Sequence, residues 1–135
     1  MRLKFFFYAA AVSIGLAGIQ HLTDLAIDPE HSEDASIAAF FIIAGLAQVF
    51  WILPTAKRWT RPWHYIGLAG NAVLVILWGL TRLPNPITGG EAEPIEEIGI
   101  SVQLSQISYI VLIAIAIIRQ KQMMKIQHRT AADAA

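Results

Sequence analysis

Long runs of apolar residues alternate with short polar stretches along the chain, and four of these runs are long enough to cross a lipid bilayer. They cover roughly residues 5–27, 35–53, 63–83 and 98–118. Each is about 20 residues long, which at about 1.5 Å per residue matches the ~30 Å of hydrocarbon in a membrane. The pattern predicts an all-α protein: a single domain with four transmembrane helices, followed by a basic tail at 119–135.

The prolines support these boundaries, because each of them falls at or beyond the end of an apolar run. They are Pro29, Pro54, Pro62, Pro84, Pro86 and Pro94. Proline has no backbone N–H and breaks the interior of a helix, which in lipid must satisfy its own hydrogen bonds. We therefore expect the second helix to end before Pro54 and the third to begin after Pro62. The first run also fits a signal peptide, but we expect an uncleaved helix.

Composition agrees with a membrane protein and excludes several kinds of chemistry. Hydrophobic residues make up 56% of the 135 residues and charged residues 15%, with a mean hydropathy of +0.53. A soluble domain carries about 25% charged residues. The chain has no cysteine, which excludes disulfides, thiolate metal ligands and cysteine nucleophiles.

The charged residues are sorted between the two sides of the predicted bundle. Nine of the ten basic residues fall on one side: Arg2, Lys4, Lys57, Arg58, Arg61, Arg119, Lys121, Lys125 and Arg129. Nine of the ten acidic residues fall on the other: Asp24, Asp28, Glu30, Glu33, Asp34, Glu91, Glu93, Glu96 and Glu97. The positive-inside rule then predicts a multi-pass protein of the cell membrane with both termini in the cytoplasm. Trp63, His64 and Tyr65 are expected to anchor the cytoplasmic interface.

Polar side chains inside the runs predict two layers across the bundle. Counting 1.5 Å per residue from the helix ends places Gln20, His21, Gln103 and Gln106 in the outer half, and Gln48 and Asn71 in the inner half. Amides at such depths hydrogen-bond across helices and contribute about 0.6–2 kcal/mol each. Small residues allow helices to approach closely, so Gly15, Gly18, Gly67 and Gly70 are expected at helix contacts.

The outer layer also holds candidate metal ligands. His21, Asp24 and Asp28 lie on one helical face if the first helix continues, and His31 follows. Imidazole and carboxylate groups bind divalent ions such as copper(II), zinc or manganese. The alternative is a structural hydrogen bond from His21 to Gln103 or Gln106.

Arg82 is the one basic residue on the acidic side, where a cation needs a partner. The following loop is stiff at its prolines and bends at Gly89 and Gly90. This loop could return Glu93 toward Arg82, and we expect a structural ion pair between them that fastens the loop over the bundle. Asp24 or Asp28 are alternative partners, and extension of the guanidinium to a lipid phosphate is a third interpretation.

Residues 78–94, WGLTRLPNPITGGEAEP, resemble a segment of small, functionally uncharacterised four-helix membrane proteins of bacteria and archaea. The positions that match are Trp78, Thr81, Arg82, Pro84, Pro86, Glu93 and Pro94. The resemblance implies the same four-helix fold. The acidic positions in the fourth helix of that family correspond here to Gly99 and Gln106, which departs from a shared charged site. In type, the chain is also similar to small accessory subunits of membrane-bound copper monooxygenases, including ammonia monooxygenase.

These features favour a non-catalytic membrane subunit or interaction protein, such as an accessory component of a copper-dependent ammonia monooxygenase. Its partners would be other membrane-protein subunits or further copies of this chain. The alternatives are a metal-handling protein that uses His21 and Asp24, with bound copper or zinc, and a small-solute carrier. The basic tail directly follows a span, which favours anionic lipid rather than nucleic acid. The glycine pair at 89–90 lacks the lysine-bearing helix of a phosphate-binding loop.

Overall fold

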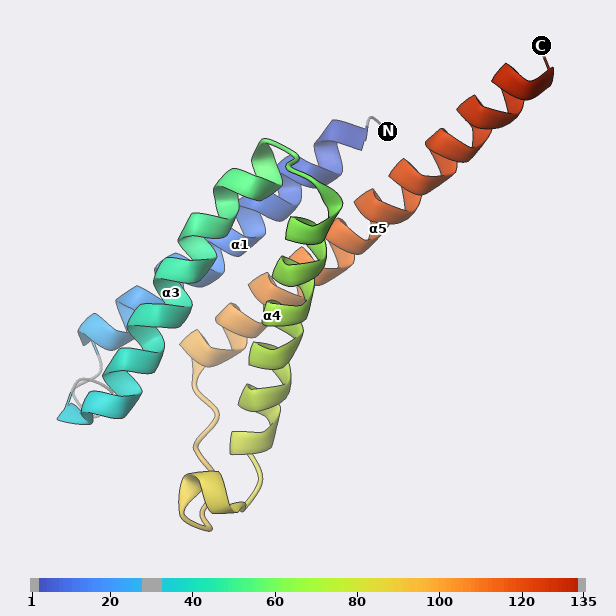
Figure 1. The fold of residues 1–135 in the computed structure, drawn as a ribbon. Helices are drawn as coiled ribbons and strands as arrows, with labels where there is room; N and C mark the ends of the chain where they lie inside the picture. The colour runs from blue at the N-terminus through green and yellow to red at the C-terminus, as the bar shows by residue number, and fades with distance from the viewer. Residues whose placement is uncertain (1–2, 28–32, 134–135) are drawn as a thin grey trace.

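The computed structural model describes residues 3–27 and 33–133, and within these ranges the chain is all-helical (Figure 1). Four long helices run in alternating directions: α1 (Leu3–Ile27), α3 (Ala35–Ala56), α4 (Arg61–Thr81) and α5 (Glu97–Asp133). A short 3₁₀ helix, η1 (Pro86–Thr88), lies in the loop before α5. The four long helices are all long and apolar enough to cross a membrane, judged by length and composition.

Two helices extend beyond the ends expected from sequence. The second was expected to end before Pro54, but α3 passes through this residue to Ala56. A proline in the last turn gives up one hydrogen bond there, and the Pro54 carbonyl accepts from the Trp59 N–H at 2.9 Å. The fourth helix was expected to end near residue 118, before a basic tail, but α5 continues to Asp133. Residues 119–133 contain no proline or glycine to end a helix.

The hydrophobic core lies between α1 and its two neighbours, α3 and α5. Phe7 and Ile14 of α1 meet Tyr109 and Ile113 of α5, and all four side chains are almost fully buried. By contrast, α4 packs mainly on α5 and touches α3 little. Figure 1 shows α3 and α4 close together near residues 57–60 and diverging toward the opposite end. Three helices thus form a tight core, and the fourth leans away from it.

Helices α1 and α3 approach each other closely at Gly18 and Gly45. A Cβ built on Gly18 would lie 2.8 Å from the Gly45 carbonyl oxygen and 2.9 Å from the Val49 backbone nitrogen. Only a residue without a side chain fits against backbone at this distance. Gly45 was not among the glycines expected at helix contacts, because its partner on α1 is visible only in three dimensions.

The other glycines expected at helix contacts give a mixed result. A Cβ on Gly15 would meet a side chain of α3, and one on Gly67 would overlap the Trp51 ring and the Tyr109 hydroxyl. The expectation was wrong for Gly70, where a Cβ would meet nothing within 4 Å. This difference follows from the divergence of α4, which leaves one of its faces without a neighbour in the described chain.

His64 also departs from its expected place at the membrane interface. Its side chain is 1% exposed and its ring lies 5.1 Å from that of Phe7, measured between centroids. The first turn of α4 places His64 on the side that faces α1, so it packs inside the bundle. Trp63 does lie in an aromatic cluster near this end, with its ring centroid 5.1 Å from Trp59.

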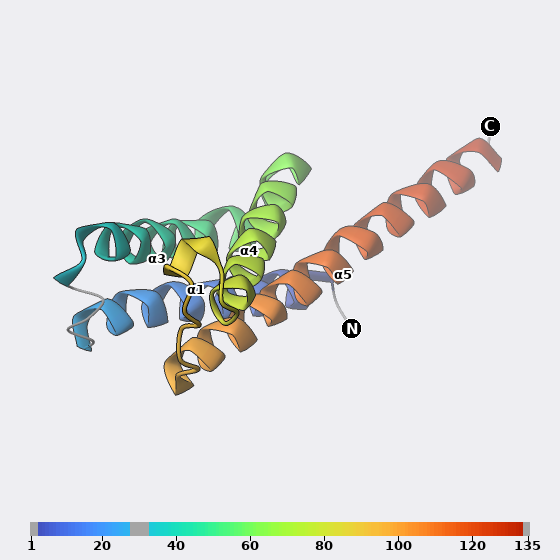
Figure 2. The same cartoon turned by 90° about the horizontal axis from the view of Figure 1, so that it is seen from below.

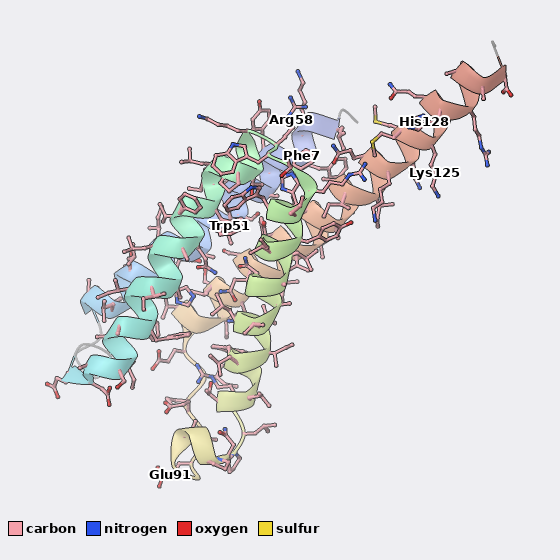
Figure 3. All side chains as sticks on the ribbon, in the orientation of Figure 1. Phe7, Trp51, Arg58, Glu91, Lys125 and His128 are labelled. Atoms are coloured by element: carbon pink, nitrogen blue, oxygen red, sulfur yellow. The ribbon has the colours of Figure 1, made fainter. Side chains whose placement is uncertain are left out.

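Charged groups are separated along the bundle in three dimensions as they are in sequence. Arg58 and Lys125 lie toward one end and Glu91 lies at the other, as Figure 3 shows. The last part of α5 projects away from the other helices (Figure 2). Where it leaves the bundle, the Arg119 guanidinium lies 4.8 Å from the centroid of the Phe6 ring.

Candidate functional site

A cavity of about 470 Å³ opens at the acidic end of the bundle, between the last turns of α1 and α4 and the first turns of α3 and α5. The loop between α4 and α5 forms one of its walls. The polar side chains that line it are those of His21, Asp24, Ser36, Trp78, Thr81, Arg82, Thr88, Glu93, Glu96, Gln103 and Gln106. The cavity falls within the size range of small-molecule sites, about 300–1,000 Å³.

The outer polar layer expected from sequence forms part of this wall. The His21 Nε2 atom lies 3.3 Å from the Gln106 Nε2 atom, one of the two contacts expected for this histidine. Gln20, the residue before His21, donates to Ser101 Oγ and accepts from Ser105 Oγ at 3.2 Å. These contacts join α1 to α5 through side chains that are largely buried.

Several polar atoms around the cavity have no hydrogen-bond partner in the described chain, although they are buried. They are Nδ1 of His21, Nε1 of Trp78, Nε of Arg82, Oε1 of Gln103 and Oε1 of Gln106. The histidine and the two glutamines are more than nine-tenths buried as residues. Buried polar atoms are nearly always paired, because an unmade hydrogen bond costs about 1–3 kcal/mol. Five buried side-chain atoms without a partner in the described chain thus belong to residues that line this cavity.

Arg82 ends α4 at the rim of this cavity. Its guanidinium carbon lies 4.8 Å from the centroid of the Trp78 ring, and one terminal nitrogen donates to Thr81 Oγ1 at 3.3 Å. The Glu93 side chain lines the same cavity. However, the contact between the loop and the helix end is a backbone one, from the Glu93 N–H to the Thr81 carbonyl at 2.9 Å. The loop thus returns to the end of α4 as expected, while the pairing of Arg82 with Glu93 stays a prediction.

The loop is held in this position by its own hydrogen bonds. The Asn85 side-chain amide donates to the carbonyls of Leu80 at 2.8 Å and Leu83 at 2.7 Å, and so caps the end of α4. Gly89 and Gly90 have φ angles of 69° and 94°, which side chains disfavour. The wall that the loop gives to the cavity is therefore set by local sequence.

The candidate metal site is described only in part. His21 and Asp24 are buried and line the cavity, whereas Asp28 and His31 lie outside the described residues. Across residues 3–27 and 33–133, no three histidine or acidic side chains are grouped as metal ligands would be. Binding of copper or zinc by the four residues stays a prediction.

The inner polar layer lies below a second, apolar groove between α3 and α4. Gln48 Nε2 donates to Asn71 Oδ1 at 3.1 Å, and Asn71 Nδ2 donates to the Gly67 carbonyl at 2.9 Å. These two amides form the floor of the groove, which has a volume of about 320 Å³. Phe40 and Leu74 line both the groove and the polar cavity, so the two spaces adjoin.

Two contributors to the site were not singled out as such from the sequence. Trp78 appeared only as part of a motif, yet its indole N–H borders the cavity beside Arg82. Gly99 of α5 leaves room for both: a Cβ there would lie 3.0 Å from the Trp78 Nε1 atom and 3.7 Å from a terminal nitrogen of Arg82. Which residue of α4 lies beside a given residue of α5 cannot be read from the sequence.

Fold and cavity together define a class: a four-helix protein with membrane-length apolar helices and a polar cavity at the acidic end. Comparison with known proteins gives no narrower assignment, since no protein-family model, curated protein or solved structure matches this chain. The resemblances noted from the sequence therefore stay predictions.

Proposed function

We propose that this chain is a non-catalytic, multi-pass protein of the cell membrane, with both termini in the cytoplasm, whose outer cavity binds the polar part of a ligand. The observation that carries the proposal is the set of five buried, unpaired polar atoms around one cavity. They are contributed by α1, α4 and α5, and they include both donors and acceptors.

The membrane orientation is supported by the separation of charge between the two ends of the bundle (Figure 3). Because the chain has no cysteine, single-cysteine variants test it directly. In intact cells, a membrane-impermeant maleimide should label Glu91→Cys but should label Arg58→Cys only after permeabilisation. The reverse pattern would invert the bundle, and labelling of both from outside would contradict a spanning topology.

Ligand binding can be tested by native mass spectrometry of protein extracted gently from its own membrane. The wild-type chain should carry a small-molecule adduct, which Gln103→Leu should lose. The same variant should be as stable as the wild type or more stable, because it removes an unpaired buried carbonyl. Gln120→Leu, a matched change on α5 that lies outside the cavity, should keep the adduct. A wild-type chain without an adduct, or a marked loss of stability in Gln103→Leu, would instead assign the Gln103 amide a structural role.

A second candidate function is that of a subunit in a larger membrane complex, such as the copper monooxygenase type noted above. It is favoured by the open face of α4, where Cβ atoms on Gly70 and Gly79 would meet nothing within 4 Å. Such a face suits close packing with a helix of another chain or of a second copy. Native gels of membrane extracts should then show a complex that Gly70→Leu and Gly79→Leu disrupt. Migration of the wild type as a single chain would exclude this role.

A further inference from the structure

The polar cavity and the apolar groove adjoin at Phe40 and Leu74 and have two different linings. The cavity lies at the acidic end and is lined by unpaired donors and acceptors. The groove starts from the shared residues Phe40 and Leu74 and runs between α3 and α4 as far as Trp51 and Gly67. Along α3, from Phe40 to Trp51, this path measures about 17 Å at 1.5 Å per residue. Such a space matches a molecule with a polar head and a long apolar chain.

The groove has no polar group to offer a ligand beyond its floor. Gln48 donates to Asn71, and Asn71 donates to the Gly67 backbone carbonyl, as described above. The remaining lining consists of apolar side chains, a tryptophan and two glycines, and Ile43 and Ile66 stand more than half exposed at its edges. In a membrane, a hydrocarbon chain would cover these side chains at little cost, because the groove opens toward lipid.

The charged side chains that line the cavity are of both signs. The Arg82 guanidinium and the Trp78 indole N–H are donors, and their Nε and Nε1 atoms respectively have no partner in the described chain. Arginine with a second donor is a strong arrangement for phosphate. The carboxylates of Asp24, Glu93 and Glu96 belong to the same lining. A purely anionic head would be attracted by Arg82 and repelled by these carboxylates.

We infer that the cavity and groove together bind a zwitterionic aminophospholipid, with its phosphate at Arg82 and Trp78, its ammonium group at Glu93 and Glu96, and one acyl chain in the α3–α4 groove. This inference rests on the proposed function and names the ligand class for the same cavity. The charge pattern selects the aminophospholipid over a fatty acid or an anionic phospholipid, and the groove selects it over a water-soluble headgroup.

The inference is tested by titrating the purified protein in neutral detergent with phosphatidylethanolamine, phosphatidylglycerol and water-soluble glycerophosphoethanolamine, with bound species counted by native mass spectrometry. Phosphatidylethanolamine should bind most tightly. Arg82→Gln should weaken it by about tenfold or more, the scale of a hydrogen bond to a charged group. The matched control Arg129→Gln, on the projecting part of α5, should bind as the wild type does.

Two further variants test the binding of the lipid headgroup and of the acyl chain separately. Gly99→Asp would place a carboxylate beside Arg82 and Trp78, so it should compete with the phosphate and weaken all phosphate-bearing probes. Gly70→Leu would extend into the groove from a Cβ that has no atom of the described chain within 4 Å, and should weaken lipid binding about tenfold, equivalent to about two buried methylene groups. Binding of glycerophosphoethanolamine should be unaffected by Gly70→Leu. Gly79→Leu lies outside both spaces and is the matched control.

Each outcome decides a different part of the proposal. If the wild type binds glycerophosphoethanolamine as tightly as the lipid, the polar site stands but the acyl chain plays no part. Preference for phosphatidylglycerol or a free fatty acid over phosphatidylethanolamine would overturn the zwitterionic assignment alone. Absence of binding by all three probes, together with a bare native protein, would refute both this inference and the proposed function.

Discussion

A methyl group at Gly18 would test how closely α1 and α3 must approach. The new Cβ would lie 2.8 Å from the Gly45 carbonyl oxygen, which is 0.6 Å short of the 3.4 Å at which ordinary contact begins. It would also lie 2.9 Å from the Val49 backbone nitrogen. Because both atoms belong to the backbone of a helix, no side-chain rotation relieves the overlap. The two helices must therefore separate locally by several tenths of an ångström.

The expected magnitude combines two opposing effects. Overpacking of a close contact costs about 1–3 kcal/mol. Replacing glycine by alanine inside a helix contributes about 1 kcal/mol of stability. Gly18→Ala should therefore be destabilising by about 0–2 kcal/mol. Gly79→Ala has the same helix effect but no overlap, since nothing lies within 4 Å of its new Cβ, and should be stabilising by about 1 kcal/mol.

The comparison of these two variants is the measurement. Protein in neutral detergent would be titrated with sodium dodecyl sulfate, and unfolding followed by far-ultraviolet circular dichroism. The helix-propensity term is common to both variants, so the difference in unfolding free energy reports the overlap alone, at about 1–3 kcal/mol. Equal stabilisation by both substitutions would refute the close approach of α1 and α3, and with it the tight three-helix core.

Three other predictions can be checked in the same titration. The coupling energy between Gln48 and Asn71, measured from Gln48→Leu, Asn71→Leu and the double variant, should be about 0.6–2 kcal/mol, because each amide loses its partner in the single variants. Additive effects would contradict the hydrogen bond. Arg82→Ala should lower stability more than Lys57→Ala does, because it removes contacts with the last turn of α4; equal small losses would argue against fastening at this helix end. Gly67→Ala should cost about 1–3 kcal/mol, because its methyl group would enter space that two aromatic side chains already fill, and a neutral effect would contradict that packing.

Much of the fold could be predicted from the sequence because hydropathy and proline act locally. A run of about 20 apolar residues must become a helix if it is to satisfy its backbone in lipid, whatever its neighbours are. Depth along a helix also follows from counting, which is why Gln48 and Asn71 could be placed in one layer. Local rules fail where a helix has no stop signal, as beyond residue 118 of α5, or where proline falls in a last turn, as at Pro54.

The arrangement of helices around one another could not be predicted in the same way. Hydropathy records which residues leave water, but it does not record which face of a helix meets which neighbour. Gly45 was missed and Gly70 was wrongly expected at a contact for this reason. The candidate site has the same limit: His21 and Gln106 were foreseen as partners by depth, whereas the part played by Gly99 depends on how α4 lies against α5.

The divergence of α4 and the polarity of the cavity have a common physical basis. Glycine at the α1–α3 contact lets two helices close on each other, while α4 is held mainly by α5 and by the loop that returns to Thr81. Moving the last turns of α4 toward α1 would bury the Arg82 guanidinium further in a medium of low dielectric. Burying this charge without forming an ion pair is costly. Leaving α4 apart keeps the guanidinium at a rim, at the expense of unpaired atoms on His21 and Gln106. A ligand that supplies an anionic group to the rim and a hydrocarbon chain to the groove would pair the guanidinium and cover the apolar side chains of the groove, so the divergence of α4 that leaves both open also suits a bound lipid.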